Sequence, residues 1–182
     1  MEDYEVFKKY SIDQIEEIQQ GLKEDLDISV YAKPEFNHAQ MKQIRRGLEN
    51  GLEVSVYAQP DFNHAQMAQI RFGLENGLDV SAYAKPEFDW EQMMTIRFGL
   101  EKGIDVSLFA KPEFSQSQML QIRLGVEAGA DASIYAKPEF DCLLMEQIRE
   151  GLEKGLDVSD LLPLSAKIET WCEQENEEDL ER

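Results

Sequence analysis

The sequence predicts an all-α protein, an α-solenoid of about six 26-residue repeats, each a long helix and a short one, with a C-terminal capping helix. Three observations predict it. The unit YAKPEFNHAQMKQIRRGLENGLEVSV begins at Tyr31 and recurs from Tyr57, Tyr83, Phe109 and Tyr135. Each copy carries a helix start signal, apolar residues at helical spacing and a terminating glycine. One such unit cannot bury its apolar face alone, whereas stacked units bury a continuous core.

Each long helix is predicted to start at a capping signal. In the first full copy, Asn37 stands at the N-cap and Gln40, three residues later, completes a capping box. Phe36 and Met41 are spaced for a hydrophobic staple across this cap. The proline just upstream forbids helix there, so each helix must begin afresh. The last copy departs from the pattern, because Leu144 replaces the glutamine.

The body and the end of each long helix follow from the next residues. Met41, Ile44 and Leu48 form one apolar stripe at helical spacing, which we expect to face neighbouring repeats. Gly51 is predicted to end the helix at the position after its C-cap. Glu53, which is Asp in the four later copies, can then cap a short helix of little more than one turn.

The repeats divide the chain into three predicted segments of one continuous domain. Residues 1–30 hold a degenerate N-terminal capping repeat, which keeps the helix pattern but lacks the proline. Residues 31–160 hold five tandem repeats, and residues 161–182 hold a C-terminal cap and an acidic tail. The hand and the curvature of the solenoid do not follow from the pattern.

The cysteines and the apolar runs predict where the protein resides. Cys142 and Cys172 are too few for a disulfide framework. The opening MEDYEVFKKY lacks the apolar core of a signal peptide, and no apolar run approaches transmembrane length. We therefore expect a reduced, cytoplasmic protein that does not bind a membrane.

The net charge of −19 on 182 residues is extreme. Such a charge predicts solubility and partner type rather than fold. It disfavours binding of phosphate groups, which requires Lys and Arg to displace counterions. It favours a basic protein partner, such as a protein whose positively charged groove normally holds nucleic acid.

No catalytic pattern is recognisable. The chain has no glycine-rich phosphate loop, no HExxH and no GxSxG, and the repeated serines have no histidine within their unit to act as a base. His38 and His64 share a helix position that holds Trp, Gln or Cys elsewhere, which disfavours a metal site. We expect no enzymatic activity, no cofactor and no metal.

One arginine recurs in each full repeat and forms a predicted arginine stripe: Arg45, Arg71, Arg97, Arg123 and Arg149. A stripe of this kind could follow the phosphates of DNA. The alternative is an internal ladder, because a Glu follows each of these arginines by four residues. The acidity of the chain favours the ladder.

A glycine also recurs in the middle of each long helix, at Gly21, Gly47, Gly73, Gly99, Gly125 and Gly151. Glycine at such a position costs about 1 kcal/mol relative to alanine, so its repetition indicates a close approach. We expect helices to cross closely there. The alternative is a binding site at exposed backbone.

One face of the long helix varies between repeats. Two of its positions are apolar in the three central repeats, where they hold Ala68, Phe72, Met94, Phe98, Leu120 and Leu124. The outer repeats have polar residues there, for example Lys42, Arg46, Glu146 and Glu150. An apolar patch bounded by charge predicts a partner-binding or dimer site. The alternative is that curvature buries only the middle repeats.

The pattern DVS.YA.PEF...QM..IR.GLE.GLDVS resembles a tandem repeat of gut bacteria and their mobile elements. At this length and acidity the chain resembles the type II-A anti-CRISPR proteins, which inhibit Cas9. The resemblance implies binding to Cas9 with its guide RNA, loss of target-DNA engagement or cleavage, and a place in the bacterial host cytoplasm. It assigns no residue.

Three further hypotheses stay open beside that resemblance. The chain could be a general protein-interaction scaffold for another bacterial partner, which is the common use of solenoid surfaces. It could form a homodimer through the apolar patch. It could also bind DNA directly along the arginine stripe, although the net charge disfavours this.

Overall fold

A computed structural model describes residues 9–162 of the chain. Within that range the backbone forms α-helices, short 3-10 turns and loops and contains no strand, so the all-α prediction is confirmed. The chain forms two compact units, Met1–Pro112 and Glu113–Arg182. Of the predicted C-terminal cap, residues 163–182 lie outside the described part, and the predicted segment boundaries stay predictions.

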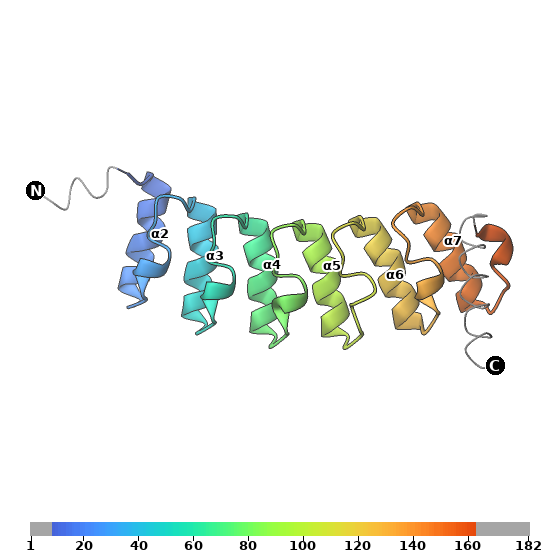
Figure 1. Ribbon diagram of the computed structural model, residues 1–182. Coiled ribbons are helices and arrows are strands. Elements are labelled where there is room, and N and C mark those ends of the chain that lie inside the picture. Colours follow the sequence, from blue (N-terminus) through green and yellow to red (C-terminus); the bar gives the residue numbers. More distant parts are fainter. Residues whose placement is uncertain (1–8, 163–182) are drawn as a thin grey trace, which may run out of the picture. The chain divides into compact units, whose positions relative to one another are not determined.

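In the first unit, four long helices of 12 residues lie side by side in chain order (Figure 1): α2 (Ile12–Lys23), α3 (His38–Glu49), α4 (His64–Glu75) and α5 (Trp90–Glu101). Each contacts the next. A single 3-10 turn follows each of the first three helices: Ile28–Val30, Val54–Val56 and Val80–Ala82. The short helix is therefore three residues long and ends within one turn.

The second unit repeats this arrangement. Its long helices are α6 (Gln116–Ala128) and α7 (Cys142–Glu153), which contact each other. The 3-10 turns are Ala132–Ile134 after α6 and Ser159–Leu161 after α7. No helix in residues 9–162 is both long enough and apolar enough to span a membrane.

The predicted helix caps are present. Reciprocal capping boxes start five helices, at Ser11, Asn37, Asn63, Asp89 and Ser115. On α7, Asp141 still accepts a bond from the Leu144 amide, but no reciprocal side chain exists there. At the other end of α3, Gly51 has a φ of +66°, which confirms the predicted glycine terminus.

The capping glutamine also joins neighbouring repeats. Besides accepting the Asn37 amide, Gln40 donates from Nε2 to the carbonyl of Phe62, 2.7 Å away in the next repeat. Gln14, Gln66 and Gln118 make the equivalent bond to the carbonyl of the next phenylalanine. Because Gln40 itself is buried, this bond satisfies a carbonyl that water cannot reach.

The glycine in the middle of each helix makes room for a side chain. A Cβ at Gly47 would lie 1.9 Å from the Tyr57 hydroxyl oxygen and 2.7 Å from a methyl carbon of Val54. The Tyr57 hydroxyl, in turn, donates to the carbonyl of Gln43 at 3.2 Å. The predicted close approach is confirmed, but the approaching atoms belong to Tyr57 and Val54 and not to a crossing helix.

The core of each repeat consists of the residues that recur. In the second repeat, Tyr31, Phe36, Met41 and Ile44 are all fully buried. Leu48, the third residue of the predicted stripe, is only half-buried. The stripe is therefore buried together with the tyrosine and the phenylalanine that precede the helix, and its C-terminal end reaches the surface.

Candidate functional site

The arginine stripe is almost entirely withdrawn from solvent. The side chains of its five members are only 6–13% exposed. Each pairs through Nη1 with the glutamate four residues later: Glu49, Glu75, Glu101, Glu127 and Glu153. The pairing predicted by the internal-ladder alternative is thus confirmed.

Four of these arginines also bind the preceding repeat. Arg71 donates from Nε to the Gln43 side-chain oxygen at 3.1 Å, and Arg97 donates likewise to Gln69 at 3.2 Å. Arg45 reaches Glu17 and Arg149 reaches Gln121 in the same way, 28 residues back in each case. The Arg123 Nε is buried without a hydrogen-bond partner among residues 9–162.

This geometry removes the stripe from contact with external phosphates. A guanidinium can bind a phosphate only if its N–H groups are free and accessible. In Arg71 and Arg97, Nε and Nη1 are already engaged by side chains of the same unit. The stripe therefore acts as a connection between helices.

The predicted apolar patch is partly open to solvent. Phe72 and Phe98 occupy the same position on the neighbouring helices α4 and α5, and each residue is 38% exposed. Ala68 and Met94, one turn earlier, are half-buried. In the second unit, Leu120 and Leu124 hold the same two positions on α6 and are half-buried as well. The alternative of a patch buried by curvature does not describe the two phenylalanines.

The two exposed rings stack on the buried stripe. The Arg71 guanidinium carbon lies 4.4 Å from the centre of the Phe72 ring, and Arg97 lies 4.5 Å from that of Phe98. Arg97 is also 5.7 Å from the centre of Phe72, so this ring bridges two repeats. Cation–π contacts of this kind fix the orientation of an aromatic side chain. The rings are therefore held in place before any partner arrives.

Two cations flank these rings in the same unit. Arg46 holds the position of Phe72 on α3, and Lys42 holds that of Ala68. Arg46 is exposed, and its side chain has no hydrogen bond or ion pair within the described part of the chain. In a chain this acidic, a free arginine beside exposed aromatic rings is available to contact a partner.

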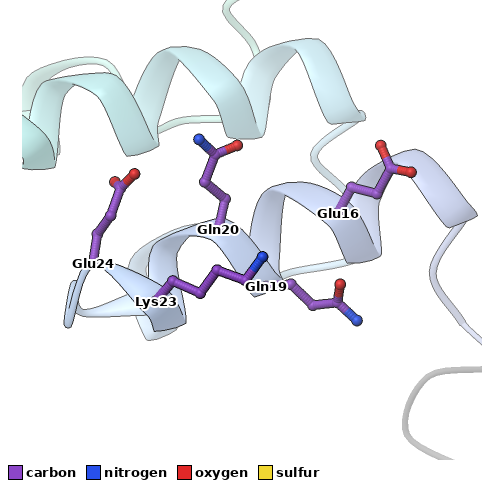
Figure 2. A pocket seen from close by; sticks show the side chains of 5 residues that line it. All are labelled: Glu16, Gln19, Gln20, Lys23 and Glu24. Atoms are coloured by element: carbon purple, nitrogen blue, oxygen red, sulfur yellow. The ribbon is translucent and has the colours of Figure 1, made fainter.

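In the first repeat the same positions form an open polar groove of about 370 Å³. It is lined by Glu16, Gln19, Gln20, Lys23 and Glu24, and Figure 2 shows Gln20 and Glu24 extending from α2 toward the neighbouring helix. Gln19 stands where later repeats have the arginine. The groove holds amides, carboxylates and one lysine, and no nucleophile beside a base.

Exposed acids recur on the short turns. Asp27 and Asp79 cap the first and the third of these turns, and each accepts a bond from the amide of the serine two residues on. Hydrogen bonds from the side chains and backbones of Ser29 and Ser81 hold the pKa of these two carboxyls below its usual range. They are therefore fully ionised at neutral pH.

The buried tyrosines titrate abnormally for a different reason. Burial raises the pKa of Tyr31 and of Tyr135 to about 12, and it raises the pKa of Tyr57 and Tyr83 further. The nearby arginine of the stripe opposes this rise in each case. Their hydroxyls stay protonated and donate to helix carbonyls, which is a structural role.

Among residues 9–162, no group of three or more His, Cys, Asp and Glu side chains is placed to hold a metal ion. His38 and His64 are exposed at the first position of their helices.

Sequence reasoning missed the contacts that join repeats. The second bond of Gln40, the Tyr57 hydroxyl above Gly47 and the Nε bond of Arg71 were not predicted. One signal could have found the last of them, since Gln or Glu stands 28 residues before four of the five arginines.

Comparison with known protein families, with curated proteins and with solved structures finds no match to this chain.

Proposed function

We propose that this chain is a non-enzymatic α-solenoid of six repeats that inhibits a basic protein by binding to it. The proposed partner is Cas9 with its guide RNA, in the cytoplasm of a bacterial host that carries the gene on a mobile element. The observation that carries the proposal is the separation of charge. The recurring arginines are paired inside the repeats, while acids and two aromatic rings remain on the surface.

The paired arginines make the surface more acidic than the composition implies. In each of the five pairs the arginine side chain is 6–13% exposed and the glutamate side chain is 19–30% exposed, so the cation is withdrawn from the surface further than the anion. Asp27 and Asp79 add ionised carboxylates at the same place in the first and third repeats, and Glu53 holds that place in the repeat between them. Carboxylates repeated at regular intervals suit a channel built for phosphates, such as the one that holds the guide–target heteroduplex in Cas9.

Apolar contacts would complement this electrostatic attraction. Long-range attraction between unlike charges accelerates association, whereas buried aromatic anchors supply most of the affinity of an interface. Phe72 and Phe98 are such anchors, because the arginines beneath them already hold their rings in place. Binding would then rest on both the acids and the two rings.

The test adds the purified protein to a Cas9–guide complex and scores target-DNA binding and target cleavage separately. We expect inhibition that weakens as the salt concentration rises, because salt screens charge attraction. Absence of any interaction with the complex at low salt would refute Cas9 as the partner. Equal inhibition at low and high salt would refute the electrostatic part.

A matched pair of variants sharpens this test. Replacing Asp27, Asp79 and Asp105 with Asn removes three charges, and the Asn side chain can still accept the amide bond from the serine. We expect weaker inhibition at unchanged helicity. Replacing Lys33, Lys85 and Lys111 with Gln changes the charge by the same amount in the opposite direction and should not weaken inhibition.

A homodimer is the second candidate, and the position of Arg46 favours it. Arg46, Phe72 and Phe98 hold one helix position in three successive repeats. A two-fold axis at Phe72 would bring each Arg46 over the Phe98 of the other copy, where a cation–π contact is favourable. Sedimentation at several salt concentrations tests this, and a dimer should strengthen as salt screens the repulsion between two acidic chains.

Two further candidates have their own tests. A general interaction scaffold is favoured if pull-down from a bacterial lysate recovers one protein other than Cas9, by way of the same two rings. Direct DNA binding along the arginine stripe requires a mobility shift that the wild type shows and that replacement of Arg71, Arg97 and Arg123 with Ala abolishes. The low exposure of these arginines argues against that outcome.

A further inference from the structure

The last described repeat lacks the aromatic side chain that covers the mid-helix glycine in the earlier repeats. After four of the long helices, a tyrosine covers the mid-helix glycine and donates to the carbonyl four residues before that glycine. In the second unit, Tyr135 covers Gly125 and donates to the Gln121 carbonyl at 3.2 Å. After α5, Phe109 takes the same place over Gly99. An aromatic ring over the glycine is thus the rule for the repeat.

We call the place of this ring over the mid-helix glycine the aromatic seat. After α7, no aromatic ring occupies this seat within the described residues. The residue 26 positions after Tyr135 is Leu161, which is 40% exposed. Among residues 9–162, a Cβ at Gly151 would meet only Val158 within 4 Å. A groove of about 420 Å³ occupies the place. It is lined by Leu156, Val158 and Leu161, by Gln147 and Gly151, and by the charged Glu150, Lys154 and Asp157. Gln147 holds the sequence position whose carbonyl accepts the tyrosine hydroxyl in the four earlier repeats.

Other residues of this repeat have changed toward an apolar end. Leu144 replaces the glutamine that would bind the phenylalanine carbonyl of a further repeat. Leu143, which stands where the earlier full repeats have Ala, Glu or Ser, is 62% exposed, and Leu156, which recurs from earlier repeats, is 59% exposed. The end of α7 is therefore not prepared to bind another unit of the same kind. It offers an aromatic seat bordered by Leu156, Val158 and Leu161, with charged side chains beside them and one carbonyl acceptor.

We propose that Trp171 of the segment 163–182 occupies this seat. The described chain ends at Leu162, beside the groove, and 20 residues follow. Nine residues lead from Leu162 to Trp171, a reach of up to about 30 Å when extended. In the sequence, Ile168, Trp171 and Cys172 have the i, i+3, i+4 spacing that is typical of one helix face.

The chemistry of the indole fits the seat. Tryptophan carries a large apolar ring and a single N–H donor, and a buried tryptophan requires an acceptor for that donor. The carbonyl of Gln147 can take the role that the Gln121 carbonyl plays for Tyr135. The segment thus closes the array in place of a further repeat, and this holds whatever the partner of the protein is.

The test uses the full chain in a Trp90→Phe background, so that Trp171 is the only tryptophan. We expect blue-shifted emission and slow quenching by acrylamide, as for a buried indole. Adding Leu161→Tyr supplies the missing tyrosine, which should displace Trp171 and raise its quenching several-fold at unchanged helicity. Leu143→Tyr is the control, because Leu143 is exposed and does not line the groove, and it should leave quenching unchanged.

Three outcomes would overturn the proposal. Trp171 could be quenched in the folded chain as fast as in the unfolded chain. Its protection could persist in the Leu161→Tyr variant. Protection that disappears on dilution would show instead that a second copy covers the groove.

Discussion

Arg71 and Phe72 are consecutive residues with opposite roles, and the two regions they belong to are governed by different constraints. The buried seam between α3, α4 and α5 contains the tyrosines, arginines and glutamines that recur in nearly every repeat. The exposed row beside it holds Arg46, Phe72 and Phe98 at one position of successive repeats.

The comparison of the seam with the row indicates which residues of a repeat array can determine the choice of partner. In the seam, each side chain meets a fixed partner in the neighbouring repeat, as Arg71 meets Gln43, so a change there disturbs two repeats. In the row, the ring of Phe72 rests on Arg71 but leaves a third of the residue in contact with water. Residues of the row can therefore be replaced by others of different polarity without altering the packing between repeats.

Substitution of a mid-helix glycine should destabilise the seam more than any other change considered. In Gly73→Ala, the new methyl group would lie 1.9 Å from the Tyr83 hydroxyl oxygen and 2.8 Å from Val80. We expect a loss of about 3 kcal/mol or more in the free energy of unfolding, measured by urea denaturation, because overpacking of a tight core forces side chains from their rotamers.

Gly77→Ala is the matched control, because a Cβ there meets nothing within 4 Å and strains only a φ of +68°. We expect it to cost about 1 kcal/mol. Equal losses in the two variants would show that the Tyr83 contact does not explain the glycine. Adding Tyr83→Phe to Gly73→Ala should recover part of the loss, since it removes the nearest atom.

Loss of an arginine should weaken the seam by a smaller amount. Arg71→Ala removes the pair with Glu75, the bond to Gln43 and the support beneath Phe72. We expect a loss of about 2–3 kcal/mol by thermal or urea unfolding, as for a half-buried charged hydrogen bond whose partners are left behind.

Arg46→Ala removes an equal charge from the free position next to the seam. Because its side chain has no partner among the described residues, the change should cost no more than about 0.5 kcal/mol. If the two arginine variants proved equally stable, the ladder would contribute nothing to the fold.

High pH should weaken the seam through its tyrosines. Burial raises the pKa of Tyr31 and Tyr135 from the ordinary value of 10.0 to about 12 in the folded chain. At pH above 10 the unfolded chain loses these protons while the folded chain keeps them, so stability falls as pH rises. Urea midpoints should therefore be constant up to about pH 9 and decline between about 10 and 12.

The Tyr135→Phe variant, measured over the same pH range, isolates one of these groups. It loses the bond to Gln121 and should be less stable at neutral pH, with a shallower decline above pH 10. An identical decline in both proteins would mean that Tyr135 is not the titrating group.

The sequence could predict what depends on neighbours along the chain. The capping box of Asn37 and Gln40, the terminus at Gly51 and the pair of Arg71 with Glu75 all join residues within a few positions, so local spacing reveals them.

Contacts between repeats and between adjacent residues could not be predicted in this way. Gln40 binds a carbonyl 22 residues away in the sequence, and Tyr57 binds a carbonyl 14 residues away. At such separations the spacing of residues in the sequence does not predict which side chains meet. Consecutive residues of a helix do not ordinarily face each other, so nothing in the sequence indicates that Phe72 stacks on Arg71. Their stacking depends on the side chain of Arg71 reaching across to Gln43, which only the folded neighbour supplies.

The row should be the least costly region to change, and the most direct measurement replaces Phe72 and Phe98 with Glu. Both rings are partly exposed, and the long side chain of Glu can still lie against the arginine beneath. We therefore expect a loss of no more than about 2 kcal/mol for the pair in the free energy of unfolding. Binding to the partner, or self-association, should disappear.

The control is Leu22→Glu with Trp90→Glu, which adds the same charge at exposed apolar residues outside the row. Titration of each purified variant against the partner, together with its melting curve, shows whether the two rings bind the partner or stabilise the fold. We expect the Phe72→Glu, Phe98→Glu protein to fold and to lose binding, and the control to bind as the wild type does. A protein that unfolds, or one that stays folded and binds unchanged, would contradict this expectation.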